Sequence, residues 1–151
     1  MKPKLLLGLT LVLSGALSGC ATRSGQVTQA DRLHAEKAAL EYMFNKFDAP
    51  FSGGSSMRES NYIYVLKAGE LTSQLVNEFH GRKPAVVARV NSVDGRCIFW
   101  NTSIQEMTRD HATIYVYYYF YTESQGSYLL ELHHSQDGWM AESEKTSRPS
   151  P

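Results

Sequence analysis

The sequence predicts a single α+β domain, in which an N-terminal amphipathic helix and a short second helix pack on one face of an antiparallel meander sheet. Three observations favour this fold class. Apolar side chains recur at helical spacing in two segments before residue 81, strand-forming residues dominate after residue 85, and tight-turn sequences separate the later segments. The 151 residues are 42% hydrophobic and 20% charged, which suits one globular domain rather than a disordered chain.

The first helix is expected from Asp31 to Phe47. Thr28 and Asp31 stand at the spacing of a capping box, which satisfies backbone N–H groups at the start of a helix. The apolar side chains that follow at spacings of seven, four and three share one helix face: Leu33, Leu40, Phe44 and Phe47. Pro50 cannot continue a helix, so we expect the helix to end before it.

A short strand and a second helix are expected next. Residues 62–66 are β-branched, aromatic or aliphatic, which favours a strand. Residues 70–80 place apolar side chains at steps of four, the spacing of one helix face: Leu71, Leu75 and Phe79. Gly81 and Pro84 follow directly and are typical of a helix end.

The C-terminal half predicts strands separated by short turns. The expected strands are 86–93, 96–100 with an irregular continuation to 107, 112–122, 127–134 and 139–145. Asp94-Gly95 is a dipeptide favoured in two-residue hairpin turns, and similar turn residues stand at 124–126 and 136–138. Because short connections join antiparallel neighbours, we expect consecutive strands to pair with one another.

The first twenty residues have the features of a targeting segment. Two lysines precede an apolar run from Leu5 to Leu13, which is shorter than the roughly 20 residues that span a bilayer. The run ends in Leu17-Ser18-Gly19-Cys20, which resembles the lipobox of bacterial lipoproteins in every position. The resemblance implies that residues 1–19 are a signal peptide, and that Cys20 carries a diacylglyceryl group and an acyl chain such as palmitate.

The same resemblance implies the placement of the mature chain. Residues 20–27 are small and polar and predict a lipidated tether, residues 28–146 the single domain, and residues 147–151 a loose tail. Ala21, rather than Asp, follows Cys20. In lipoproteins of Gram-negative bacteria an Asp there commonly retains the protein at the inner membrane. Its absence implies a lipid-anchored protein of the outer membrane that faces the periplasm.

The predicted body also resembles known α+β folds over roughly residues 60–145. The order helix, strand, helix, meander is similar to cystatin-like and nuclear-transport-factor-like folds. Ser127-Tyr128 and Gly138-Trp139 stand where small uncharacterised bacterial lipoproteins have comparable pairs. The resemblance implies a fold and no particular activity. Trp139, directly after a glycine turn, is expected to anchor the last strand against the helix.

Four tyrosines alternate along the strand expected at 112–122. Side chains alternate between the two faces of a strand, which places Tyr115, Tyr117, Tyr119 and Tyr121 together. The opposite face then gathers the residues expected to face the core: Ile114, Val116, Tyr118 and Phe120. Three interpretations stay open for the tyrosines. They form a half-exposed face stabilised by cross-strand pairs, a surface that recognises a partner, or the lining of an enclosed cavity.

The sequence shows no catalytic signature, no cofactor motif and no metal site. Glu131 and His133 share one face of a predicted strand, but zinc needs three or four ligands. Cys97 is expected to be a buried small hydrophobe, since no motif pairs it with a histidine. Fifteen basic and fifteen acidic residues argue against nucleic-acid binding, which needs a clustered basic surface.

We therefore expect a non-enzymatic envelope lipoprotein. Its contacts are expected to be the membrane, through acylated Cys20, and a periplasmic or outer-membrane protein partner, through the tyrosine row. The alternative is a small-molecule-binding protein or cryptic enzyme with an aromatic-lined cavity in a cone-shaped fold. The sequence leaves the oligomeric state undetermined.

Overall fold

The computed structural model describes residues 26–49, 61–67, 69–91, 96–120 and 125–147. These residues form an α+β fold, as expected. In chain order, its elements are α1 (Gln29–Asp48), β1 (Ile63–Leu66), α2 (Thr72–Glu78), β2 (Ala85–Val87), β3 (Cys97–Met107), β4 (His111–Phe120), β5 (Gln125–Ser135) and β6 (Gly138–Ser147). The predicted signal peptide, Cys20, Tyr121 and the Asp94-Gly95 turn lie outside the described residues.

All the described strands belong to one sheet with the order β2-β1-β3-β4-β5-β6. The four strands from β3 to β6 form the expected antiparallel meander. The pairing of β3 with β4 shifts between Ile104 and Glu106, which is the predicted irregularity before Met107. Only two residues, Gln136 and Asp137, connect β5 to β6.

The predicted pairing of residues 86–93 with residues 96–100 is wrong. Strand β2 ends at Val87 and pairs in parallel with β1, and β1 in turn pairs in parallel with β3. The helix α2 connects β1 to β2, and strands joined through a helical crossover run parallel. β1 therefore occupies the position beside β3 that the hairpin would have given to β2, and its last three residues are buried.

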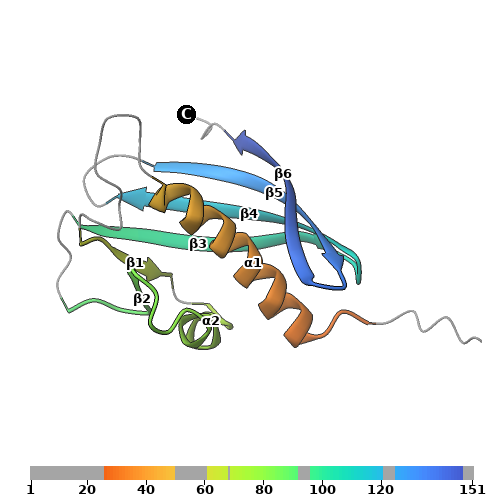
Figure 1. Ribbon diagram of the computed structural model, residues 1–151, viewed down its shortest axis with the longest axis horizontal. Coiled ribbons are helices and arrows are strands. Elements are labelled where there is room, and N and C mark those ends of the chain that lie inside the picture. Colours follow the sequence, from red (N-terminus) through yellow and green to blue (C-terminus); the bar gives the residue numbers. More distant parts are fainter. Residues whose placement is uncertain (1–25, 50–60, 68, 92–95, 121–124, 148–151) are drawn as a thin grey trace, which may run out of the picture.

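Helix α1 begins at a complete capping box. The Thr28 side chain accepts a hydrogen bond from the backbone N–H of Asp31, and the Asp31 carboxylate accepts one from the backbone N–H of Thr28 at 2.8 Å. Figure 1 shows α1 crossing the sheet, with α2 beside the end that carries β1 and β2. α1 contacts strands β3 to β6 and also α2. The helix thus connects the meander to the parallel end of the sheet.

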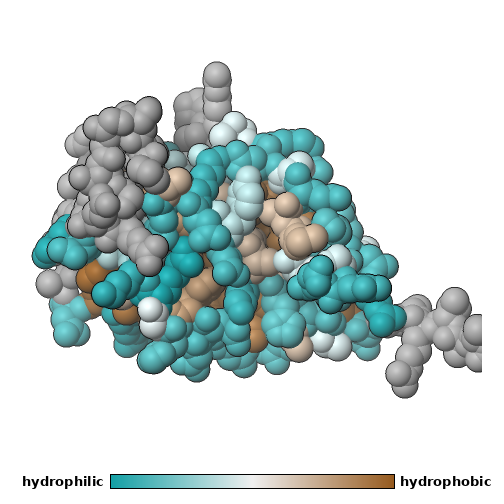
Figure 2. Space-filling view, in the orientation of Figure 1, coloured by the Kyte–Doolittle hydropathy of each residue, from teal (hydrophilic) through white to brown (hydrophobic). Residues whose placement is uncertain are grey.

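The core lies between α1 and the sheet and is rich in aromatic rings. Trp100 is fully buried, and its ring centroid lies 5.1 Å from that of Phe44, 5.0 Å from Phe47 and 5.5 Å from Tyr64. Leu75 of α2 and Phe79, which caps the C-terminal end of α2, join the same core. Hydrophilic residues cover most of the face in view in Figure 2, as expected for a helix that buries only one stripe.

Trp139 differs from Trp100 in its burial. Its ring is only partly buried, packs against the edge of the core and lies 5.2 Å from the ring of His134, centroid to centroid. It therefore anchors β6 at the margin of the core. Neither helix in the described part of the chain is long and apolar enough to cross a membrane.

Candidate functional site

Tyr115, Tyr117 and Tyr119 of β4 lie on the side of the strand that faces away from the core, whereas Tyr118 packs against the core. Ile114 and Val116 are fully buried, whereas Tyr117 is 40% exposed and Tyr119 is 39% exposed. Tyr115 is half-buried on the same side. The predicted alternation of faces is therefore confirmed for the three tyrosines that the structure describes.

Neighbouring strands extend this row into a surface. Phe99 of β3 is paired with Tyr119, and the two rings are stacked with centroids 4.7 Å apart. Leu129 of β5 is paired with Tyr115. Along β4 itself, the rings of Tyr115 and Tyr117 lie 5.6 Å apart. We call this set the aromatic face: Phe99, Tyr115, Tyr117, Tyr119 and Leu129.

A charged pair borders the aromatic face on the β5–β6 side. Lys145 donates to Glu131 at 2.9 Å, and the Ser143 hydroxyl donates to the same carboxylate at 2.9 Å. These hydrogen bonds, the one from Lys145 first, lower the pKa of Glu131, and the bond to Glu131 raises the pKa of Lys145. Leu129 is paired with Lys145 across the strands, so the ion pair lies at the margin of the apolar area.

The two residues considered as metal ligands do not form a metal site. Glu131 is bound to Lys145 and Ser143, whereas the Nδ1 atom of His133 lies 3.4 Å from Glu142. That contact lacks hydrogen-bond geometry, since His133 Nδ1 has no hydrogen-bond partner among the described residues. Within the described ranges, no group of three or more His, Cys, Asp or Glu side chains is arranged to hold a metal ion. Cys97 is buried, as expected.

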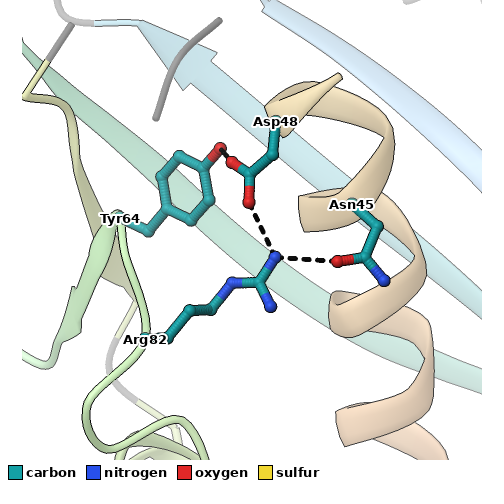
Figure 3. A network of polar contacts seen from close by, with 4 residues as sticks. All are labelled: Asn45, Asp48, Tyr64 and Arg82. Atoms are coloured by element: carbon teal, nitrogen blue, oxygen red, sulfur yellow. Dashed lines mark hydrogen bonds and ion pairs between the residues drawn. The ribbon is translucent and has the colours of Figure 1, made fainter. Parts of the chain in front are cut away.

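A polar network that the sequence analysis missed lies at the end of α1 (Figure 3). Arg82 donates from Nη2 to Asp48 at 2.8 Å and to Asn45 at 2.9 Å, and the Tyr64 hydroxyl donates to Asp48 at 2.7 Å. Burial first, and then the bond to Asp48, raise the pKa of Tyr64 well above its usual range. The network joins α1, β1 and the segment after α2. Its residues are far apart in sequence, and no motif announces them.

A cavity of about 150 Å³ lies where α1, the start of α2 and β3 meet. Glu36 of α1 lines it and accepts a hydrogen bond from the Thr102 hydroxyl at 2.6 Å. Partial burial is the main cause that raises the pKa of Glu36. Sequence reasoning did not single out Glu36, because its partner is 66 residues away.

No protein-family model, curated protein or solved structure matches this chain. What the chain does is therefore inferred from its own residues. Of the three places described above, the aromatic face exposes Tyr117 and Tyr119, the Asp48–Arg82 network holds elements together, and the cavity combines charged and apolar lining residues.

Proposed function

We propose that this chain is a non-enzymatic lipoprotein of the bacterial envelope, anchored in the outer membrane through acylated Cys20. In this proposal the aromatic face binds a periplasmic or outer-membrane protein. The observation that supports binding is the exposure of Tyr117 and Tyr119, at 40% and 39%, on the side of the sheet away from α1. The lipobox residues at 17–20 support the anchor.

Tyrosine suits recognition of a protein for a physical reason. Its ring contributes a large apolar area, its hydroxyl remains able to hydrogen bond, and few rotatable bonds are immobilised on binding. Stacking between Phe99 and Tyr119 restricts both rings further. A partner that covers the face therefore gains apolar burial at a low cost in side-chain entropy.

The arrangement of the helices supports an available surface. We infer that both helices cover the face opposite the tyrosines, because α1 contacts β3 to β6 and α2 shares the core with α1. Ile114 and Val116, which alternate with the tyrosines, are fully buried in that core. The helices then leave the aromatic face for a partner.

The exposure also bears on the other two interpretations. Cross-strand pairing accounts for the contact of Phe99 with Tyr119, yet about two fifths of each of Tyr117 and Tyr119 remains accessible. Side chains that line an enclosed cavity are more deeply buried than this. We therefore favour an open recognition surface over a purely structural face or an aromatic-lined cavity.

Metabolic labelling tests the anchor. Cells grown with labelled palmitate should yield a labelled wild-type chain, whereas a Cys20→Ser variant should remain unlabelled and unprocessed. An unlabelled wild-type chain, or normal processing and release of the variant, would contradict lipidation at Cys20.

Crosslinking in cells tests the partner surface. A Tyr117→Ser/Tyr119→Ser variant should lose a crosslinked species that the wild-type chain forms. Tyr42→Ser is the matched control, because Tyr42 is 37% exposed and lies on the helix side of the sheet, where it donates to Glu144. Circular dichroism establishes that both variants fold. The same crosslinked species in all three proteins would remove the aromatic face from the proposal.

A further inference from the structure

The cavity at Glu36 has an apolar floor and polar walls. Its floor is formed by buried side chains from both helices and two strands: Leu40, Leu66, Leu71, Leu75 and Trp100. Glu36 and Thr102 stand in its wall, joined by their hydrogen bond of 2.6 Å. At about 150 Å³ the cavity holds roughly five waters, at about 30 Å³ of liquid volume each. Its size therefore fits a ligand of a few non-hydrogen atoms rather than a drug-sized molecule.

Two observations suggest that the cavity is more than a packing defect. Glu36 places a carboxylate in a partly desolvated position, where burial raises its pKa and only Thr102 donates to it among the described residues. Trp100 is fully buried, and its indole N–H has no hydrogen-bond partner in the described part of the chain. Burying a carboxylate and leaving an indole N–H without a partner both cost stability. If this region served stability alone, apolar side chains would be expected in place of these polar groups.

The rim of the cavity adds charges of the opposite sign. Arg32 of α1 and Lys67, which follows β1, are exposed lining residues, and neither forms an ion pair with a described residue. Glu70, the other acidic residue of the rim, already accepts a hydrogen bond from Gln29 at 3.3 Å. The cavity thus presents the Glu36 carboxylate in its wall, and two cations together with the Glu70 carboxylate at its rim.

We propose that this cavity binds a small zwitterion, an α-amino acid with a short side chain. The ammonium group binds the Glu36 carboxylate, the ligand's carboxylate faces Arg32 and Lys67, and the side chain rests on the apolar floor. A ligand with only a positive charge would have no group to pair with Arg32 and Lys67. A ligand with only a negative charge would be repelled by the Glu36 carboxylate. This site is separate from the aromatic face and does not depend on the proposed function.

Isothermal titration of the full-length chain in detergent tests the ligand class with three matched probes. L-Alanine carries both charges, ethylamine lacks its carboxylate, and propionate lacks its ammonium group. We expect L-alanine to bind with a Kd of about 1 mM or tighter, and each of the other two to bind at least about tenfold more weakly. No binding of L-alanine at 10 mM (about ten times the expected Kd) would overturn the proposal, as would ethylamine or propionate binding as tightly as L-alanine.

Variants test the assigned residues. Glu36→Gln keeps the shape of the side chain and its acceptor for Thr102, and it should weaken L-alanine binding by at least about tenfold. Arg32→Ala should weaken the binding of L-alanine but leave the residual binding of ethylamine unchanged. Glu41→Gln, an exposed position on the same helix, is the matched control and should bind normally. Unchanged L-alanine binding by Glu36→Gln would overturn the assignment of the ammonium site.

Discussion

Phe99 and Tyr119 stack face to face across β3 and β4, with ring centroids 4.7 Å apart and ring planes inclined by only 5°. The two residues are direct neighbours in the strand register. The stack fixes one end of the aromatic face, whereas Tyr117 lies beside it without a stacked partner among the described rings. The aromatic face thus combines a rigid end with rings that keep more freedom.

The stack predicts an energetic coupling between its two rings. In a double-mutant cycle with Phe99→Leu and Tyr119→Leu, urea unfolding should give a coupling of about 0.5–1 kcal/mol, because aromatic pairs contribute roughly this much beyond area burial. The control cycle pairs Phe99→Leu with Tyr115→Leu, whose rings are not in register. Equal coupling energies in the two cycles would contradict a specific stack.

The two tryptophans should differ in their contribution to stability. Trp100→Ala should lower the free energy of unfolding by about 3–5 kcal/mol, because it leaves a large cavity among Phe44, Phe47 and Tyr64. Trp139→Ala should cost about 1–2 kcal/mol, since its partly buried ring loses less buried area. Urea unfolding measures both values, and the reverse order would show that the core is centred elsewhere.

Gly126 should not tolerate a larger side chain. A Cβ atom added there would lie 2.5 Å from the Tyr118 hydroxyl and 2.7 Å from its ring carbons. Gly126→Ala should therefore destabilise the chain by about 1–3 kcal/mol, through displacement of the Tyr118 ring from the margin of the core. In a Tyr118→Ala background the same substitution should cost much less. If Gly126→Ala destabilised the Tyr118→Ala variant as much as it destabilises the wild type, the cause would be the backbone at position 126 and not the Tyr118 ring.

The Asp48–Arg82 network should stabilise the junction of α1 with the parallel end of the sheet. Asp48→Ala removes the acceptor of both Arg82 and the Tyr64 hydroxyl, and should cost about 2–4 kcal/mol. Tyr64→Phe removes one hydrogen bond and should cost about 1 kcal/mol. Asp110→Ala, at an exposed turn, is the control and should change stability by less than about 0.5 kcal/mol. Urea unfolding measures the loss in unfolding free energy for each variant. Equal losses for all three variants would argue against the network.

Glu36 should reduce stability as the pH rises. Burial raises its pKa in the folded chain above the ordinary value of 4.5, so the folded state binds its proton more tightly than the unfolded state does. Stability is therefore lost as the pH rises from about 4.5 through the folded pKa. Glu36→Gln should match the wild type near pH 4 and exceed its melting temperature at pH 7. A variant less stable at pH 7 would show that the carboxylate contributes to the fold.

Local patterns predicted most of the elements because each depends on neighbours in sequence. The capping box at Thr28 is made within four residues, and the alternation of β4 follows from strand geometry alone. Both features are confirmed. The helix stripe was predicted incompletely: Ala35, Ala39 and Met43 are fully buried but were not singled out, because small and flexible side chains give a weak apolar signal.

Features that depend on distant residues were not predicted. The insertion of β1 between β2 and β3 follows from the α2 crossover and from how the core is filled, which a local turn signal at 94–95 does not report. The Arg82 contacts span 34 and 37 residues, and the Glu36–Thr102 bond spans 66. Sequence spacing carries no information about such pairs.

The most direct test of the central claim places a photoreactive phenylalanine analogue at position 117 of the lipidated chain in growing cells. The same analogue at position 42, on the helix side of the sheet, is the control. The account predicts a discrete crosslink to one envelope protein from position 117 and none to that protein from position 42. No crosslink from position 117, or the same products from both positions, would contradict a partner-binding aromatic face.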